Sequence, residues 1–282
     1  MVPTRTETVE YRSLDDLASA DDAGQEADAT GLAPRVRLRP ITAARRLPGL
    51  SVFLPAHNEE GNLKTIVELF AAELPKVADA WEIVIVDDGS RDRTGVIADQ
   101  LAAADSHIRV VHHPVNRGYG GAVISGMRAC TLPYMLLSDS DGQFDPADMS
   151  HLIAYIGDYD VVIGRRVRRA DHLLRRINGK AWTMLCTMLF GLNISDMDCG
   201  FKLFRREMTE RLELRSDGAM ITTELMARLA GSGARIMEVD VNHLPRAAGT
   251  QTGNSPRAIF RAFKELFKLY RELKTARGDN GL

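Results

Sequence analysis

The sequence is poor in cysteine and in net charge, and each shortage excludes a class of protein. Its three cysteines, Cys130, Cys186 and Cys199, have no Cys-x-x-Cys spacing. This argues against a disulfide framework and a structural zinc site, and favours reduced thiols in the cytoplasm. The formal net charge of −2 argues against a nucleic-acid partner held by bulk charge. Anions must therefore be bound by local groups of arginine and backbone N–H.

Long apolar stretches are also absent. The longest, residues 181–192, is about twelve residues long, whereas a helix that spans a bilayer needs roughly 20. Residues 1–10 lack the apolar core of a secretory signal. We therefore expect a chain that does not cross a membrane.

Large apolar residues are few at the start of the chain. Residues 11–31 are rich in Asp, Ala and Ser, and such a segment buries too little apolar surface to offset the entropy cost of ordering. We predict a disordered leader over residues 1–47, with a regulatory or docking role as the alternative. One folded domain is expected over residues 48–252, followed by a C-terminal helix and tail over residues 253–282.

From Leu50 onward, short apolar runs alternate with segments of helical periodicity. The expected strands are residues 51–55, 82–87, 108–112, 134–139 and 160–164. The expected helices are residues 59–74, 94–104 and 118–130, and a further helix opened by Asp145-Pro146. This alternation predicts an α/β fold in which helices flank a doubly wound, mostly parallel sheet.

Polar or turn-forming residues follow four of these strands, at residues 55–59, 87–90, 116–118 and 139–141. Helix caps and turns easily explain one such end. Parallel strands, however, present their carboxyl ends at one edge of the sheet, where ligands of this architecture bind. Four ends of this kind therefore predict a ligand site at that edge.

Asp139 and Asp141 lie one residue apart after the fourth expected strand. Strand alternation would turn both carboxylates to the same side, so that both could reach one cation. Mg²⁺ is commonly bound by one or two carboxylates together with substrate phosphates. Gln143 adds an amide oxygen two residues further on. An Asp-x-Asp pair alone is a weak signal, and its position between a strand and a helix strengthens it.

Eight ordered motifs extend this pattern along the chain. They are Pro55-Ala-His-Asn-Glu-Glu60, Val86-Asp-Asp-Gly-Ser90, Asn116-Arg-Gly118, Asp139-Ser-Asp-Gly-Gln-Phe-Asp-Pro146, Val162-Ile-Gly-Arg165, Arg175-Arg-Ile-Asn-Gly179, Asp198-Cys-Gly-Phe201 and His243-Leu-Pro-Arg246. In order and spacing they resemble the family 2 inverting glycosyltransferases, most of all the polyprenyl-phosphate (dolichyl-phosphate) mannosyltransferases and glucosyltransferases. The resemblance spans roughly residues 50–250. It implies a fold of the GT-A type and a glycosyltransferase catalytic domain over residues 48–252.

The resemblance also implies roles for matching residues. Those expected to bind the nucleotide sugar are Pro55, Ala56, Glu59, Asp88, Asp139, Ser140, Gln143 and Arg246. Those expected to hold Mg²⁺ or Mn²⁺ with the donor diphosphate are Asp139, Asp141 and Gln143. Those expected at the catalytic centre are Asp141, Arg165, Arg175 and Asp198. Arginine suits the donor and acceptor phosphates because its planar guanidinium can bind two phosphate oxygens at once.

Three further features have two interpretations each. Asp198 is a candidate general base if the acceptor is a hydroxyl, whereas a lipid phosphate is already anionic near neutral pH and needs no strong base. The glycines of Arg117-Gly-Tyr-Gly-Gly121 either bring backbone N–H groups to an anion or make a turn. His243 either contacts a phosphate or base of the ligand or is a structural histidine whose polar atoms are satisfied within the protein. The second interpretation is somewhat favoured.

The acceptor side differs from many relatives, which carry transmembrane helices after the catalytic domain. Residues 255–274 instead predict one basic amphipathic helix, which suits a membrane interface or packing against the domain or a second subunit of a homodimer. Residues 172–192 hold a second apolar surface. Gly179 replaces a serine found in several relatives and removes one hydroxyl from the implied acceptor site.

Together these features predict a metal-dependent inverting glycosyltransferase that moves a hexose from a GDP-mannose or UDP-glucose type donor to a polyprenyl phosphate. Such an enzyme would be cytoplasmic and peripheral on the inner face of the membrane. The alternatives are a soluble hydroxyl acceptor and a non-catalytic nucleotide-sugar binding protein, against which the Asp139/Asp141 pair argues. A sugar-phosphate nucleotidyltransferase is expected to have a Gly-rich loop and a lysine directly after the first strand. This chain has Pro55-Ala-His-Asn-Glu-Glu60 there, which argues against that class.

Overall fold

The computed structural model describes residues 46–167, 173–192, 194–246 and 256–279, which all belong to the unit formed by residues 38–282. Within it, the side chains of residues 173–181, 256–262 and 275–279 are outside the description. The predicted leader falls almost wholly in residues 1–45, also outside the described residues. Its disorder and its domain boundary therefore stay predictions.

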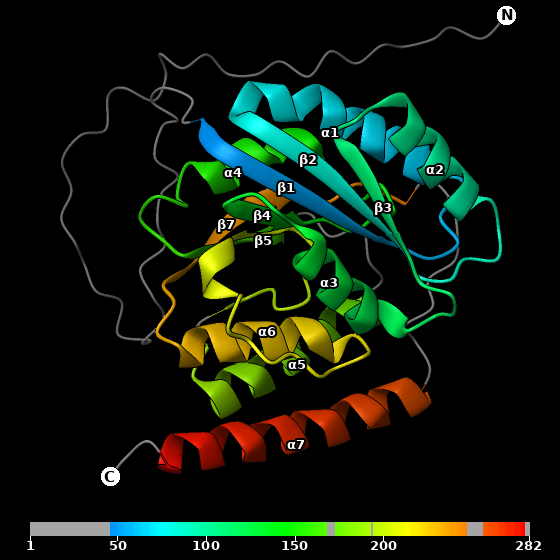
Figure 1. Cartoon of the computed structure of the whole chain (residues 1–282). Coiled ribbons are helices and arrows are strands. Elements are labelled where there is room, and N and C mark those ends of the chain that lie inside the picture. The colour runs from blue at the N-terminus through cyan, green and yellow to red at the C-terminus, as the bar shows by residue number, and fades with distance from the viewer. Residues whose placement is uncertain (1–45, 168–172, 193, 247–255, 280–282) are drawn as a thin grey trace, which may run out of the picture. The chain divides into compact units, whose positions relative to one another are not determined.

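Seven strands of the described residues form one mixed sheet in the order β3-β2-β1-β4-β6-β5-β7 (Figure 1). They are β1 (Leu47–Ala56), β2 (Ala78–Asp87), β3 (Ile108–His112), β4 (Tyr134–Leu137), β5 (Val161–Val167), β6 (Lys202–Arg205) and β7 (Ile236–Asn242). β6 runs antiparallel to both of its neighbours, whereas the other neighbouring strands pair in parallel. The predicted α/β fold with a mostly parallel sheet is confirmed.

Helices cover both faces of the sheet (Figure 1). They are α1 (Leu63–Val77), α2 (Thr94–Ala104), α3 (Gly118–Ala129), α4 (Met149–Ile153), α5 (Leu173–Phe190), α6 (Met220–Gly231) and α7 (Pro256–Asp279). Short 3₁₀ turns occupy Pro146–Asp148 and Arg206–Met208. The first of these continues into α4, and the Asp145 side chain caps it by accepting from the Ala147 N–H.

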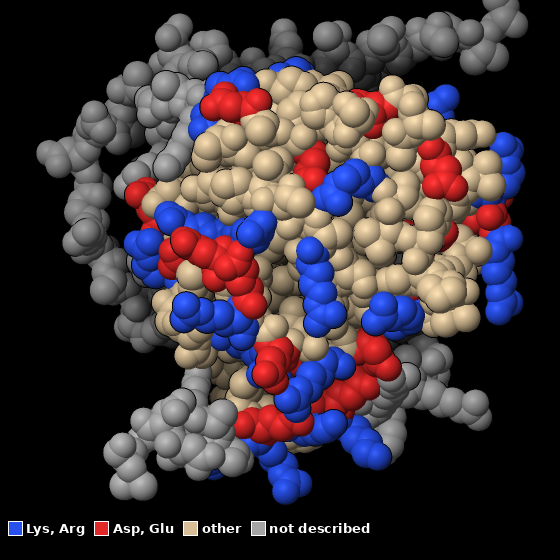
Figure 2. Space-filling view, in the orientation of Figure 1, with Lys and Arg blue, Asp and Glu red and all other residues tan. Residues whose placement is uncertain are grey.

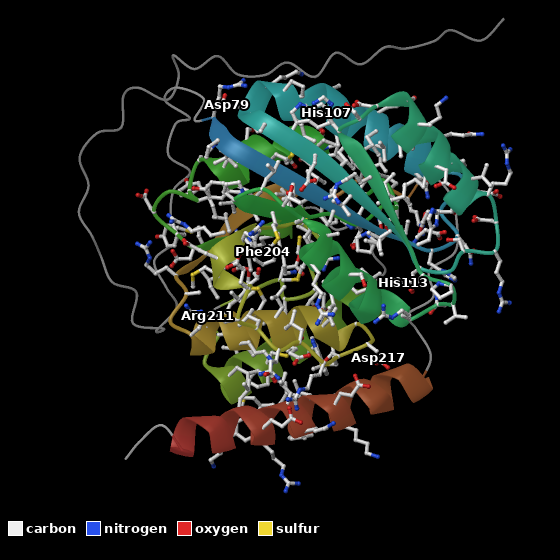
Figure 3. The ribbon with its side chains drawn as sticks, viewed as in Figure 1. Asp79, His107, His113, Phe204, Arg211 and Asp217 are labelled. Carbon is white, nitrogen blue, oxygen red and sulfur yellow. The ribbon has the colours of Figure 1, made fainter. Side chains whose placement is uncertain are left out.

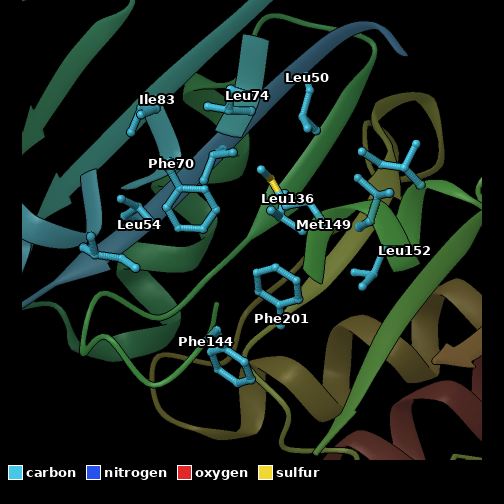
Figure 4. Close-up of a cluster of buried hydrophobic side chains, with 14 of the residues drawn as sticks. Leu50, Leu54, Phe70, Leu74, Ile83, Leu136, Phe144, Met149, Leu152 and Phe201 are labelled. Carbon is cyan, nitrogen blue, oxygen red and sulfur yellow. The ribbon is translucent and has the colours of Figure 1, made fainter. Parts of the chain in front are cut away.

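Two apolar layers hold these helices to the sheet. α1, α2 and α4 share one core with β1 residues Val52 and Leu54, part of which is drawn in Figure 4. α3, α5, α6 and α7 share the other core with Phe53, because successive strand residues face opposite ways. Because both faces of the sheet are covered, the sequences of β1 and β2 are nearly continuous runs of apolar residues.

Some boundaries differ from the sequence prediction. α1 begins at Leu63 rather than residue 59, since residues 59–62 form a turn in which the Glu59 carbonyl accepts from the N–H of Asn62 and of Leu63. β4 ends at Leu137, two residues before Asp139. The sequence did not predict β6, β7 or α6. The predicted C-terminal helix is α7, and no helix within the described ranges is long and apolar enough to cross a bilayer.

Candidate active site

The carboxyl ends of β1 to β4 lie side by side at one edge of the sheet, because these four strands are parallel neighbours. The loops after β1 and β2 are joined by hydrogen bonds. The N–H of Asn58 donates to Ser90 Oγ at 3.0 Å, and the N–H of Glu59 donates to Thr94 Oγ1 at 2.8 Å. Asn58 adopts a positive φ of 57°, which asparagine tolerates better than most residues. The two loops thus form one wall of the predicted ligand site.

Asp88 is fixed at the base of this wall. Its Oδ1 accepts from the N–H of Arg117 at 2.8 Å and lies 2.6 Å from His113 Nδ1. Its own N–H donates to the carbonyl of Ala56 at 2.9 Å. Figure 3 shows His113 at this end of the sheet. Asp88 and Ala56, both predicted to contact the nucleoside, are therefore brought together by the backbone.

Ser140 links β1 to the segment after β4. Its hydroxyl donates to the carbonyl of Pro55 at 2.7 Å, and the side chain is buried. Ser140 therefore holds Pro55 in place in this structure, and its predicted direct contact with the donor stays a prediction.

The two carboxylates of the Asp-x-Asp pair have different partners. Tyr119 donates its hydroxyl to Asp139 Oδ1 at 2.8 Å, and Asp141 Oδ1 accepts from the N–H of Gln143 at 3.1 Å. Burial, followed by the charge of Asp139, raises the pKa of Asp141 to about 6 against opposing effects from the Gln143 N–H and Arg246. Burial raises the pKa of Tyr119 well above its ordinary value and keeps the phenol a donor. The negative charge at this pair is thus poorly compensated by the protein alone.

Arg246 comes to this pair from far along the chain. Its guanidinium bonds to Glu59 and lies 3.7 Å from Asp141 Oδ2. The segment before it is held by two hydrogen bonds, from the Leu244 N–H to the Gln143 carbonyl at 2.8 Å and from Gln143 Nε2 to the Leu244 carbonyl at 3.1 Å. The predicted residues Glu59, Asp141 and Arg246 therefore form one charged group in this structure.

These residues fit a divalent cation that also binds substrate. The described residues hold no group of three or more His, Cys, Asp and Glu side chains arranged for a metal. A protein nonetheless usually contributes only one or two carboxylates to a Mg²⁺ site, and substrate phosphates and water complete the coordination shell. The amide nitrogen of Gln143 is engaged with Leu244, so only its oxygen could face a cation. Its role as a ligand stays a prediction.

Gly200 and Lys202 position the segment that carries Asp198. Sequence reasoning quoted Gly200 only as part of a motif and missed Lys202. A Cβ at Gly200 would collide with the Asp139 carboxylate. The fully buried Lys202 ammonium donates to the carbonyls of Met197, at 3.1 Å, and of Cys199. Burial lowers the pKa of Lys202, whereas the acidic groups around it, including Asp198 and Asp139, act in the opposite direction. The available signal was a lysine between the apolar residues Phe201 and Leu203-Phe204.

β5 presents two arginines at the same edge, because β5 and β4 are both antiparallel to the strand between them. Arg165 is exposed, and its Nε donates to Asp240 Oδ1 at 2.6 Å. The Arg166 side chain is only 8% exposed and binds Asp196 through two hydrogen bonds of 2.7 Å. Arg165 is therefore available to a ligand, whereas Arg166 anchors the segment that leads to Asp198.

Arg175 and Gly179 lie in the part of α5 whose side chains are outside the described residues. The structure thus gives no view of the predicted Arg175 guanidinium. Asp198 is exposed, on the segment between α5 and β6. Its role as a base stays a prediction.

The glycines after Arg117 serve close packing. The N–H of Gly120 donates to the carbonyl of Asp217 at 2.9 Å, and that of Gly118 donates to Asn116 Oδ1 at 3.0 Å. A Cβ at Gly120 would collide with the backbone of Ser216. Figure 3 shows Asp217 beside this end of α3. Close packing of Gly120 on residues 216–217 is a role that neither interpretation of this loop, an anion cradle or a turn, had named.

His243 is buried and packs edge to face against Phe144 at a ring distance of 5.7 Å. Phe144 itself stacks on Phe201 at 5.3 Å. This environment agrees with the structural interpretation of His243.

The chain matches the Glycosyl transferase family 2 over residues 51–213. It is 30% identical over 210 residues to undecaprenyl-phosphate 4-deoxy-4-formamido-L-arabinose transferase of Pectobacterium atrosepticum, covering 72% of this chain and 62% of that protein. It is 32% identical to glycosyltransferase AglD of Haloferax volcanii, covering 74% of this chain and 35% of that protein. With polyprenol monophosphomannose synthase of Mycolicibacterium smegmatis the identity is 31%, over 70% of this chain and 78% of that protein. The chain thus spans less than two thirds of the first two relatives.

Solved structures of glucosyl-3-phosphoglycerate synthase from Mycobacterium tuberculosis share the fold. The complex with UDP superposes with a TM-score of 0.58 at 18% identity, covering 83% of this chain and 81% of that chain. The complex with Mn²⁺, UDP and glucosyl-3-phosphoglycerate superposes with a TM-score of 0.55 at 21% identity, covering 83% of this chain and 78% of that chain. The fold is therefore of the GT-A type. Because the family match covers more than half of the chain, this protein belongs to glycosyl transferase family 2.

Proposed function

We propose that this protein transfers a hexose from a nucleotide sugar, of the GDP-mannose or UDP-glucose type, to a polyprenyl phosphate with inversion at the anomeric carbon. The observation that carries the proposal is the half-buried carboxylate pair Asp139/Asp141 beside Arg246, at the edge where four parallel strands end. Such an edge is where α/β sheets bind nucleotides. The family match supports the same chemistry.

Asp139 and Asp141, with the side-chain oxygen of Gln143, would hold Mg²⁺ or Mn²⁺. When bound, the cation supplies Lewis-acid neutralisation of the departing diphosphate. The raised pKa of Asp141 supports this assignment, because an uncompensated pair of carboxylates gains most from a divalent cation. Arg246 would turn from Glu59 and Asp141 to the donor phosphates, since its guanidinium can bind two phosphate oxygens.

The nucleoside would lie along the wall made by the loops after β1 and β2. Asp88, held by Arg117 and His113, offers its remaining carboxylate oxygen to a hydroxyl or base edge. Pro55 is kept in position by Ser140 and supplies an apolar surface for the base. Once Arg246 moves to a phosphate, the Glu59 carboxylate would lose this partner and could bind the ribose.

The relatives named as an undecaprenyl-phosphate sugar transferase and a polyprenol monophosphomannose synthase support a polyprenyl phosphate as acceptor. Its anionic oxygen would attack the anomeric carbon from the face opposite the leaving diphosphate. Arg165 at the end of β5 would hold the acceptor phosphate. Asp198 would act as a base only for a hydroxyl acceptor, because a phosphate oxygen needs no proton removed near neutral pH.

The first test is a calorimetric screen of GDP- and UDP-sugars with Mn²⁺, followed by transfer from the tightest donor to a short polyprenyl phosphate. We expect Mn²⁺-dependent donor binding and a glycosyl phosphate product. Asp141→Asn should lower transfer about 10²-fold or more, since the cation would lose one of its two carboxylate ligands. The matched control is Asp79→Asn at the opposite end of the sheet, which Figure 3 labels, and it should retain activity.

Near-normal transfer by Asp141→Asn, with its fold checked by circular dichroism, would overturn the metal assignment. Donor binding without transfer to the lipid phosphate, but with transfer to a soluble hydroxyl compound, would overturn the acceptor assignment. Donor binding without transfer to any acceptor and without donor hydrolysis would identify a non-catalytic binding protein.

A further inference from the structure

The outer faces of α5 and α7 expose only apolar and basic side chains where their side chains are described. On α7, the exposed residues between positions 263 and 274 are Phe263, Lys264, Phe267, Lys268, Arg271 and Lys274. On α5, the exposed residues between positions 182 and 190 are Met184 and Met188, at 66% and 72% exposure. We call these eight residues the α5–α7 surface.

The two helices lie side by side over this stretch. The rings of Trp182 and Phe263 meet edge to face with centroids 5.6 Å apart. The rings of Phe190 and Tyr270 do the same at 6.2 Å. The second contact lies further toward the C-terminus of both helices than the first, so α5 and α7 run alongside each other in the same direction. Along α5, Met184 and Met188 lie between Trp182 and Phe190, on the side of the helix turned away from these two rings and toward solvent.

Acidic residues of α7 lie outside the exposed stripe. Phe263, Phe267, Arg271 and Lys274 recur at helical spacing and share one stripe. Glu265 and Glu272 are about half a turn away, both half-buried, and Glu272 lies 4.0 Å from Arg228 and 3.9 Å from Lys268. In Figure 2, Lys and Arg side chains project from the lower edge of the view, which is the edge that α7 forms in Figure 1.

We propose that the α5–α7 surface docks the protein on an anionic lipid bilayer. Phenylalanine and methionine side chains would enter the headgroup boundary, while lysine and arginine bind anionic headgroups. Leu266 and Leu269 pack the opposite side of α7 into the core, so the helix can remain folded on the domain while its outer side meets lipid. The inference goes beyond the proposed activity and rests on it only in that a lipid-phosphate acceptor must be met at a bilayer.

The charge pattern separates a bilayer from a second copy of this chain. A two-fold interface through this surface would bring Lys264, Lys268 and their symmetry mates together. Among the described side chains of α7, only the half-buried Glu265 and Glu272 could offset part of the repulsion, and Glu272 already lies 3.9 Å from Lys268. An anionic bilayer offers complementary charge over the whole surface. Its position also suits the acceptor, because α5 connects the strand of Arg165 with the segment of Asp198.

The test is flotation of the full chain with vesicles of phosphatidylcholine, with and without phosphatidylglycerol. We expect flotation with phosphatidylglycerol vesicles, weaker flotation without the anionic lipid, and release by salt. Lys264→Glu with Lys268→Glu should lower the bound fraction about tenfold or more, and Phe267→Ser with Met188→Ser should do the same. The matched controls are on α1, which covers the opposite face of the sheet: Lys64→Glu and Leu69→Ser, both exposed, should bind as the unaltered chain does.

Equal flotation with both kinds of vesicle, or flotation that the surface variants leave unchanged, would overturn the proposal. A dimer in solution that the same variants dissociate would assign the surface to a second copy and would also overturn it. Transfer to a short polyprenyl phosphate in detergent separates this result from the proposed function, since the surface variants should retain that activity. Loss of flotation with retained transfer supports docking, whereas flotation by a chain that transfers no sugar contradicts only the proposed function.

Discussion

At the scale of single residues, the site depends on contacts that motif spacing does not specify. The carboxylate of Asp139 lies so close to Gly200 that a Cβ at this position would collide with it. Two residues further on, the buried ammonium of Lys202 binds the carbonyls on either side of Asp198. These contacts join Asp139, which is predicted to bind the donor nucleotide sugar, to the segment that carries the candidate base Asp198.

Replacing Gly200 by alanine should lower sugar transfer about tenfold or more, because the new methyl group must displace Asp139 from its position beside Tyr119. The control is Gly218→Ala, since that glycine has no neighbouring atom within 4 Å and no positive φ. Steady-state rates with increasing Mn²⁺ provide the measurement. Gly200→Ala with the metal dependence and rate of the unaltered protein would contradict this packing argument.

Replacing Lys202 by methionine should lower the free energy of unfolding by about 1–3 kcal/mol, because two buried carbonyls lose their donor and nearby carboxylates lose a cation. Removing the cost of burying the ammonium offsets only part of that loss. Urea denaturation measures the difference. Lys264→Met on the exposed side of α7 should change stability by less than about 0.5 kcal/mol. Equal stability of both variants would show that the buried ammonium contributes nothing net.

At the scale of elements, the sequence predicted the first four strands well and the last part of the chain poorly. Ser51–Pro55 and Glu82–Asp87 could be recognised because strands covered on both faces are continuously apolar. β6 could not, since its four residues include Lys202 and Arg205, and burial of a lysine is decided by tertiary hydrogen bonds. The family resemblance implied Arg246 at the site, but its pairing with Glu59 and Asp141 depends on the docking of Leu244 on Gln143.

The sequence also left the packing of α7 open, and a pair of adjacent substitutions tests it. Leu266→Ala should lower the free energy of unfolding by about 2–5 kcal/mol, because Leu266 is fully buried in the core below α5 and α6. Phe267→Ala, half exposed, should cost less than about 1 kcal/mol. Thermal or urea denaturation measures both. Similar costs for the two variants would mean that α7 does not pack on the domain as described.

At the scale of the whole molecule, the sheet consists of two parallel blocks joined by one reversed strand. β3, β2, β1 and β4 form the first block, and β5 and β7 form the second, with β6 between them. All six parallel strands end at the same edge, so donor and acceptor residues share it. Charged contacts that bridge elements of one block also link global stability to pH.

His112 on β3 lies between two carboxylates, with Nε2 2.9 Å from Asp99 and Nδ1 3.0 Å from Asp87. Asp99 and then Asp87 raise the pKa of His112. Its contribution to stability should therefore be complete below about pH 6.5, the unfolded value, and disappear as pH rises through the raised pKa.

His112→Gln should accordingly lower the free energy of unfolding most at about pH 5.5 and least at about pH 9. Urea denaturation of both proteins across that range is the measurement. Asp99→Asn should show a similar pH profile, since it removes the first of the two partners. A loss that is the same at every pH would contradict the charged interaction and leave only packing.

The reversed direction of β6 has a consequence for chain length. Because β6 is antiparallel to β4, residues that precede it, rather than those that follow it, meet the residues after β4. One residue more or fewer between Gly200 and Lys202 would either withdraw Gly200 from Asp139 or slip β6 by one position, turning Lys202 toward the face that Leu203 now occupies. The number of residues in this segment, independently of their chemistry, therefore sets the alignment of the two halves of the site.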